Sequence, residues 1–366
     1  MRIFTLLLLF GAVSPSLAIS LNPLDWFAEV PENFAEPTAE EVSAAEALME
    51  SAAQAEEKGK MRRAIRTWKK VTDDYGNTAM AADALFYRAS ALMAGGDRKG
   101  AFEVFQTLVN RYPGHERFDE VIAAQYEIAV GFMDGERGRI LGFLPGFKEP
   151  RTSIEYFEVL IRNAPYSSYA PTSLMNIALT AVSIGDKELA IDALDRLITF
   201  YPRSLLTADA YFTLAQIFAS LIDGPSYDQG TTLEAMNYYQ DFLILFPQSR
   251  FVENAESGLM QVRDIHARSR LVMGEYYYVH AKNDEAAKTY FNATITVAPE
   301  SEAADFARER LARIENGEPR PFFSSNVNND RLMDSVDSFF KERWEAYDAA
   351  DAAAQEATRV RDRNPF

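Results

Sequence analysis

Cysteine is absent from the 366 residues of this chain. The chain therefore forms no disulfide bond and has no thiolate that could bind a metal or act as a nucleophile. A bacterial lipid anchor is attached to a cysteine directly after the signal-cleavage point, and Ile19 occupies the corresponding position here. We therefore expect no covalent lipid anchor.

Histidine and basic residues are also scarce. The three histidines, His115, His266 and His280, are too far apart in sequence to predict a metal or base cluster. Glycine-rich phosphate loops and the HExxH and GxSxG motifs are missing. With 37 basic and 54 acidic residues the net charge is -17, which repels nucleic acid and anionic lipid. The sequence therefore predicts no enzyme activity, cofactor, metal or direct lipid anchor, and favours protein partners with basic surfaces.

Long apolar runs are missing beyond the N-terminus. Arg2 is followed by an apolar stretch from Ile3 to Val13, which is shorter than the roughly 20 residues that span a bilayer. This stretch predicts a signal peptide over residues 1–18, cleaved between Ala18 and Ile19, with a buried helix or a membrane anchor as the alternative. Residues 19–38 contain three prolines and predict a flexible leader.

A repeated pattern occupies most of the chain. Six times, a small residue is followed twelve positions later by proline or glycine. The small residues are Ala64, Ala101, Ser153, Ala190, Ala235 and Ala287. The terminators are Gly76, Pro113, Pro165, Pro202, Pro247 and Pro299. Large, mostly apolar residues recur four, seven and eight positions after each small residue, and these offsets mark one face of an α-helix. The small residue lets a neighbouring helix approach closely, and the proline ends the helix.

A second amphipathic segment follows each terminator, and serines between them predict helix N-caps. Those serines are Ser167 or Ser168, Ser204, Ser249 and Ser301. Two of the spacings between small residues are close to the 34 residues of a tetratricopeptide repeat. The predicted fold is therefore all-α: a right-handed superhelical array of about six tetratricopeptide-like hairpins over residues 39–315. The alternative is an irregular helical bundle with proline at its helix ends.

Three segments depart from the repeat. Residues 138–147 (GRILGFLPGF) form an apolar loop, which either packs on the next hairpin or exposes Phe143 and Phe147 to a partner. Residues 251–278 lack proline and have only Gly258 and Gly274 as weak breakers, so they predict one long helix. After a linker over 316–329, residues 330–366 predict a helical extension that caps the array or, alternatively, binds a partner.

Residues 55–315 resemble the BamD family, the tetratricopeptide component of the outer-membrane β-barrel assembly machine. Several family motifs recur in the same order. They are Asp228-Gln229, Phe246-Pro247-Gln248-Ser249-Arg250-Phe251, Arg263-Asp264, Ala267 and Tyr276-Tyr277. The resemblance implies docking onto a BamA-type barrel protein and binding of unfolded outer-membrane proteins in a groove between residues 58 and 135. It also implies a docking surface. Its candidate residues are Arg263, Arg268, Arg270, Glu275 and Tyr276.

The chain also departs from the family. It lacks the lipidated cysteine, carries Arg270 where an acidic residue is common, and lacks a basic docking residue near Tyr290. It has an extra repeat around 151–200. These differences predict a divergent relative in the periplasm, held at the outer membrane by its partner. The alternative is a general periplasmic tetratricopeptide adaptor in envelope growth or division. A lytic transglycosylase is disfavoured, because no stretch outside the repeats is long enough for a lysozyme-like domain.

Overall fold

The computed structural model describes residues 36–135, 137–140, 144–227 and 229–320. They fall into two compact units, Met1–Leu206 and Thr207–Phe366. The predicted signal-cleavage site at Ala18 and Ile19, the leader up to residue 35, Phe143 and the C-terminal extension lie outside the described residues.

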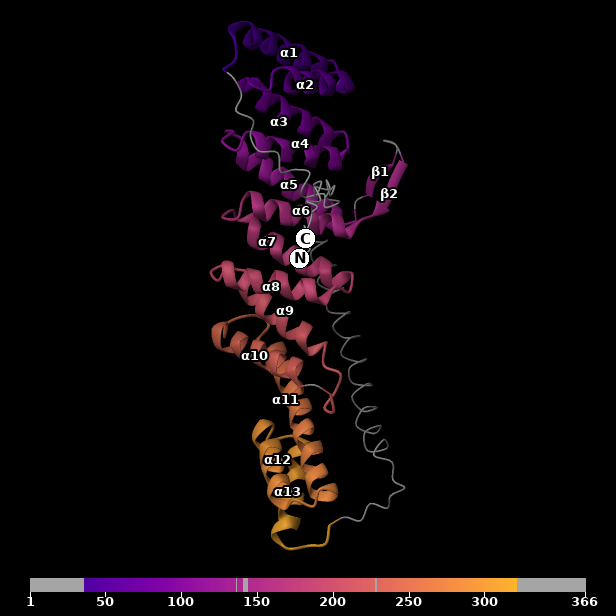
Figure 1. Ribbon diagram of the computed structural model, residues 1–366, viewed down its shortest axis with the longest axis vertical. Coiled ribbons are helices and arrows are strands. Elements are labelled where there is room, and N and C mark those ends of the chain that lie inside the picture. Colours follow the sequence, from indigo (N-terminus) through magenta and orange to yellow (C-terminus); the bar gives the residue numbers. More distant parts are fainter. Residues whose placement is uncertain (1–35, 136, 141–143, 228, 321–366) are drawn as a thin grey trace, which may run out of the picture. The chain divides into compact units, whose positions relative to one another are not determined.

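The first unit is a stack of antiparallel helices in which each helix packs on its neighbours in sequence (Figure 1). Its helices are α1 (Ala39–Glu57), α2 (Met61–Asp74), α3 (Ala79–Ala94), α4 (Arg98–Arg111), α5 (Phe118–Met133), α6 (Pro150–Asn163), α7 (Tyr169–Ser183) and α8 (Lys187–Phe200). A two-stranded hairpin, β1 (Arg137–Ile140) and β2 (Leu144–Lys148), is inserted between α5 and α6.

The second unit follows the same plan. Its helices are α9 (Thr207–Ala219), α10 (Gly230–Leu245), α11 (Val252–Glu275), α12 (Asp284–Val297) and α13 (Glu302–Glu315). A π-helical turn, η2 (Tyr276–His280), continues α11. The long helix predicted from residue 251 is thus present, and α13 covers the last hairpin by packing on α11 and α12.

The repeated residues form the core of both units. All six small residues are fully buried, and they lie on α2, α4, α6, α8, α10 and α12. The residues four positions later are at most 2% exposed. They are Trp68, Phe105, Phe157, Leu194, Tyr239 and Phe291. The predicted all-α class of tetratricopeptide-like hairpins is confirmed, and the described residues form six hairpins, from α1–α2 to α11–α12.

The predicted serines differ in what they do: Ser204 and Ser249 accept hydrogen bonds from the amides of Leu206 and Phe251, the residues directly before α9 and α11. Ser301 does cap α13, because its side chain accepts a hydrogen bond from the Ala304 amide. Ser168 stands at the start of α7 with helical dihedrals and makes no capping hydrogen bond, since a capping side chain needs an extended backbone to fold back. Three of the helices that carry a small repeat residue are capped by the side chain four positions before that residue. The capping residues are Asp97, Asp186 and Asn283.

The apolar segment predicted as a loop around 138–147 contains the antiparallel hairpin. Arg137 pairs with Lys148 and Ile140 with Leu144. The hairpin projects to one side of the first unit, while α5 and α6 still pack directly on each other (Figure 1). The insertion therefore leaves the third helical hairpin intact. The side chain of Phe147 lies outside the described residues.

Two glycines allow α11 to pack closely, rather than breaking it. A Cβ atom on Gly258 would lie 2.5 Å from Cζ of Tyr239 on α10, and one on Gly274 would lie 2.6 Å from Cδ1 of Phe291 on α12. Both glycines are buried within the helix. Real Cβ atoms do not approach ring atoms so closely. The Tyr239 and Phe291 rings can therefore occupy these positions only because α11 has glycine there.

We expect Gly258→Ala to destabilise the chain by about 1–2 kcal/mol in urea unfolding followed by circular dichroism. The added methyl group must displace the buried Tyr239 ring, at a cost of roughly 2–3 kcal/mol, the upper part of the usual range because three ring atoms lie within 3 Å of the added Cβ, against a gain of about 1 kcal/mol in helix propensity. Gly114→Ala is the control, because no heavy atom lies within 4 Å of its added Cβ. An unchanged or higher stability of the Gly258 variant would contradict the packing argument.

Candidate protein interface

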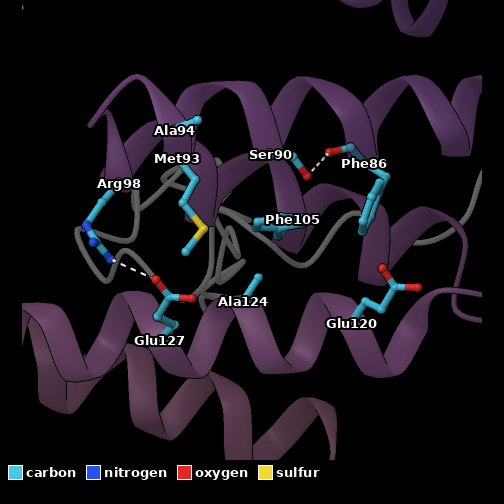
Figure 2. Close-up of a pocket in the computed structure, with 9 residues that line it drawn as sticks. All are labelled: Phe86, Ser90, Met93, Ala94, Arg98, Phe105, Glu120, Ala124 and Glu127. Atoms are coloured by element: carbon cyan, nitrogen blue, oxygen red, sulfur yellow. Dashed lines mark hydrogen bonds and ion pairs between the residues drawn. The ribbon is translucent and has the colours of Figure 1, made fainter.

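A groove lies between α3, α4 and α5 in the first unit, and Figure 2 shows its lining. Its cavity volume is about 460 Å³. Phe86, Met93, Phe105 and Ala124 supply its apolar surface. The rings of Phe86 and Phe105 pack edge to face with centroids 6.1 Å apart, so α3 and α4 together form the floor.

Charged side chains border this apolar surface. At one end, the Arg98 guanidinium on α4 lies 3.8 Å from a carboxylate oxygen of Glu127 on α5 (Figure 2). Glu120 lies toward the other end, near Phe86. Arg117 packs its guanidinium 4.8 Å from the Phe86 ring centroid. The groove thus combines an apolar floor with charges of both signs at its border.

A buried network of side-chain amides holds the helices around this groove. Gln125 on α5 donates to Gln106 on α4 at 2.9 Å, and Asn163 on α6 donates to Gln106 at 2.7 Å. Asn163 also donates to Gln125 at 3.1 Å. Gln106 and Gln125 are 4% and 0% exposed, so these hydrogen bonds satisfy side-chain amides that water cannot reach. Three helices are therefore fixed in one register, by residues that the sequence pattern did not single out.

The groove lies within the hairpins between residues 58 and 135, where the sequence predicts a receiving surface. Apolar grooves with a few polar groups bind segments whose side chains alternate in character, because the floor takes the apolar ones and the border orients the chain. The arrangement suits a bound peptide better than a reacting group. Among the described residues, no cluster of three or more acidic or histidine side chains could hold a metal ion.

Arg263 and Arg270 of α11 are seven positions apart and therefore lie on the same side of that helix. Both are partly exposed, and no carboxylate of the described residues lies within ion-pair distance of either. Arg268 lies on another side, where its Nε is 3.1 Å from a carboxylate oxygen of Asp264. Two of the three candidate arginines thus share one surface.

Glu275, another candidate, is occupied within the chain. Its carboxylate lies 2.7 Å from Nε of Arg310 on α13, and the two side chains are 17% and 8% exposed. Arg310 also packs 4.3 Å from the Phe306 ring centroid. This largely buried ion pair holds α13 onto α11. Tyr276 is 53% exposed and packs edge-on against Tyr277, so it remains open to a partner.

His266 connects α11 to the loop before α10. It is 5% exposed, and its Nδ1 lies 3.4 Å from Oε1 of Gln229. Gln229 in turn donates to the carbonyl oxygens of Gly224 and Tyr227, at 3.2 and 2.9 Å. Burial, and to a smaller extent the positive charge of Arg270, lower the pKa of His266 below 6.5. A neutral imidazole therefore fits this site.

Comparison with known families matches two parts of the chain. Residues 147–316 match the YfiO model, described as an outer membrane lipoprotein, and residues 83–115 match a tetratricopeptide repeat model. The first match contains the whole of α11. No helix among the described residues is long and apolar enough to cross a bilayer.

Two curated relatives are outer membrane protein assembly factors BamD. The one from Rickettsia prowazekii is 24% identical over 148 residues, which is 40% of this chain and 59% of that protein. The one from Caulobacter vibrioides is 23% identical over 125 residues, which is 34% of this chain and 41% of that protein. The matched part thus spans less than two thirds of either relative. A solved structure of MamA covers 59% of this chain and 91% of its own, at 18% identity and a TM-score of 0.27.

We expect the stability of the chain to fall as the pH is lowered through 6.5. Because the pKa of His266 is depressed in the folded chain, the unfolded chain binds more protons between the folded-state pKa and 6.5, and stability is lost there as pH falls. Urea unfolding at several pH values would measure this loss. In His266→Gln the loss should be smaller; equal pH dependence in both chains would show that His266 does not contribute.

Proposed function

We propose that this divergent BamD-like tetratricopeptide protein is a non-enzymatic periplasmic scaffold in the assembly of outer-membrane β-barrel proteins. Its second unit docks on a BamA-type barrel protein, which holds the chain at the outer membrane, and its first unit receives a segment of an unfolded outer-membrane protein. The main support is the family match over residues 147–316, which includes α11 and the motifs that resemble BamD.

The arginines of α11 favour docking on an acidic surface. Arg263 and Arg270 share one side of the helix, and Tyr276 is exposed farther along it. Tyrosine and arginine are enriched at the energetic centres of protein interfaces. Glu275 and Arg268, by contrast, make ion pairs with Arg310 and Asp264, so their first role is to stabilise the unit.

The groove of the first unit favours an extended peptide. Its apolar floor can take one or two large side chains, while Arg98, Glu120 and Glu127 meet the polar backbone or charged ends. The amide network keeps α4 and α5 in one register with α6, so two of the three helices that line the groove are held in place before binding. Preorganisation of this kind lowers the entropic cost of association.

We expect Arg270→Glu to weaken docking about tenfold without unfolding the chain, because it reverses a partly exposed charge at an interface. Tagged wild-type and variant chains would be used to isolate partners from gently solubilised envelopes, followed by mass spectrometry. Wild type should recover a BamA-type barrel protein in near-equal amount, and the variant much less.

Arg203→Glu is the matched control, since Arg203 is exposed, lies in the first unit and is remote from α11 in sequence. Equal recovery with Arg270→Glu and wild type would remove this side of α11 from the interface. Recovery of cell-wall or division proteins without any barrel protein would instead support a general periplasmic adaptor.

We expect Ala124→Trp to reduce peptide binding about tenfold, because the indole fills the apolar part of the groove that a peptide side chain would occupy. The probe is a fluorescent peptide with the C-terminal strand of an outer-membrane barrel protein, measured by anisotropy. Ala53→Trp, on an exposed position of α1, controls for the added ring. Unchanged affinity in Ala124→Trp would place the binding surface elsewhere.

A further inference from the structure

The most basic segment of this acidic chain lies at α2. Seven cations fall within positions 58–70, without one acidic residue among them. They are Lys58, Lys60, Arg62, Arg63, Arg66, Lys69 and Lys70. All seven are exposed. The net charge of -17 is a sum over the whole chain, and it does not reflect the local excess of positive charge on this helix.

The basic side chains share the solvent face of α2. Arg62, Arg66 and Lys69 recur at the spacing of one helical face, and Arg63 and Lys70 extend that face on one side. The opposite face buries Ala64, Trp68, Val71 and Thr72. The apolar side of α2 is therefore fully used within the unit, and only its charged side is available to a partner.

Among the described residues, few of these cations have a carboxylate partner, although Nε of Arg66 donates to the Arg62 carbonyl. Lys69 pairs with Asp73 one turn later. For the other six cations, no carboxylate in the described part of the chain lies within ion-pair distance. The neighbouring helix α1 is acidic, yet its glutamates make no such pair with α2. They are Glu40, Glu41, Glu46, Glu50, Glu56 and Glu57. The first hairpin thus presents one basic and one acidic helix side by side.

The surface chemistry of this face argues for a lipid headgroup layer over a protein. Protein interfaces are centred on buried aromatic or apolar anchors. No large apolar side chain of α1 or α2 is among the exposed ones of the described residues, the first of which along the chain is Tyr166. The cations from residue 60 to 70 extend over about 15 Å, at a rise of 1.5 Å per residue. A broad face of flexible cations fits a layer of phosphate groups, which needs no fixed geometry.

We propose that the basic face of α2 docks on the surface of a bilayer that contains anionic phospholipids. This contact is separate from the proposed docking on a barrel protein. It is purely electrostatic, because the apolar face of α2 is packed in the core, where Trp68 stacks on Tyr87 with ring centroids 5.9 Å apart. Interactions between charges more than about 10 Å apart are screened at moderate ionic strength. The cations of α2 therefore act on the bilayer surface, while most of the acidic side chains elsewhere in the chain do not. The acidic helix α1 is repelled and sets the orientation.

The test is cosedimentation of the purified full chain with vesicles of phosphatidylcholine alone or mixed with phosphatidylglycerol. We expect binding to the anionic vesicles only, and loss of binding at raised salt. Each basic side chain near an anionic surface contributes about fivefold in affinity, so Arg62→Gln/Arg66→Gln should bind about 25-fold more weakly. Arg203→Gln/Lys282→Gln removes the same charge at other exposed positions and should bind like wild type.

Thermal unfolding of both variants checks that they remain folded. The proposal is overturned if the wild-type chain does not bind anionic vesicles, or if the α2 variant and the control bind equally. A poly-glutamate peptide is the second probe. Binding of this peptide by α2 without binding to the vesicles would also overturn the proposal and would identify an acidic protein segment as the occupant.

Discussion

The close contact of helices at six small residues is the constraint on which both units depend. Ala64, Ala101 and their equivalents are fully buried, and the large side chain four positions later fills the space beside each crossing. Ser153 takes this role in α6 without an unpaired hydroxyl, because its Oγ donates to the Pro150 carbonyl at 2.7 Å. A larger residue at any of these positions would separate two helices, and the surfaces that those helices carry would separate with them.

The three candidate surfaces differ in how apolar and how charged they are. The groove on α3, α4 and α5 is apolar with mixed charges at its border, α11 offers Arg263 and Arg270, and α2 offers a run of cations. Arginine has two distinct roles here. Arg310 is almost buried against Glu275 and holds α13, whereas Arg270 has no carboxylate partner among the described residues. Exposure and pairing, more than residue type, separate the structural arginines from the candidate binding arginines.

The helices and most of the core could be predicted from the sequence, because the buried face of an α-helix appears in the sequence as a regular local spacing of apolar residues. Features that depend on partners distant in sequence could not. Gly258 and Gly274 looked like weak breakers, since only the folded chain brings the rings of Tyr239 and Phe291 against them. The pair of Glu275 and Arg310, and the amide network around Gln106, join helices that no local pattern connects. The candidate residues lie on α11 and, for Tyr276, on the π-helical turn that continues it, but a linear motif does not show which of them point inward.

The strand hairpin between α5 and α6 shows where this architecture tolerates growth. It is inserted at the turn within one helical hairpin, and the two helices still pack directly on each other, as in the hairpins that are joined by short turns. Loop closure becomes only slightly more costly as a connection lengthens, so an insertion here adds little entropic penalty. Sequence at this turn can therefore diversify independently of the helices that flank it. Such a turn is a natural site for the gain or loss of a binding element during evolution, and for grafting a foreign epitope in engineered versions of the chain.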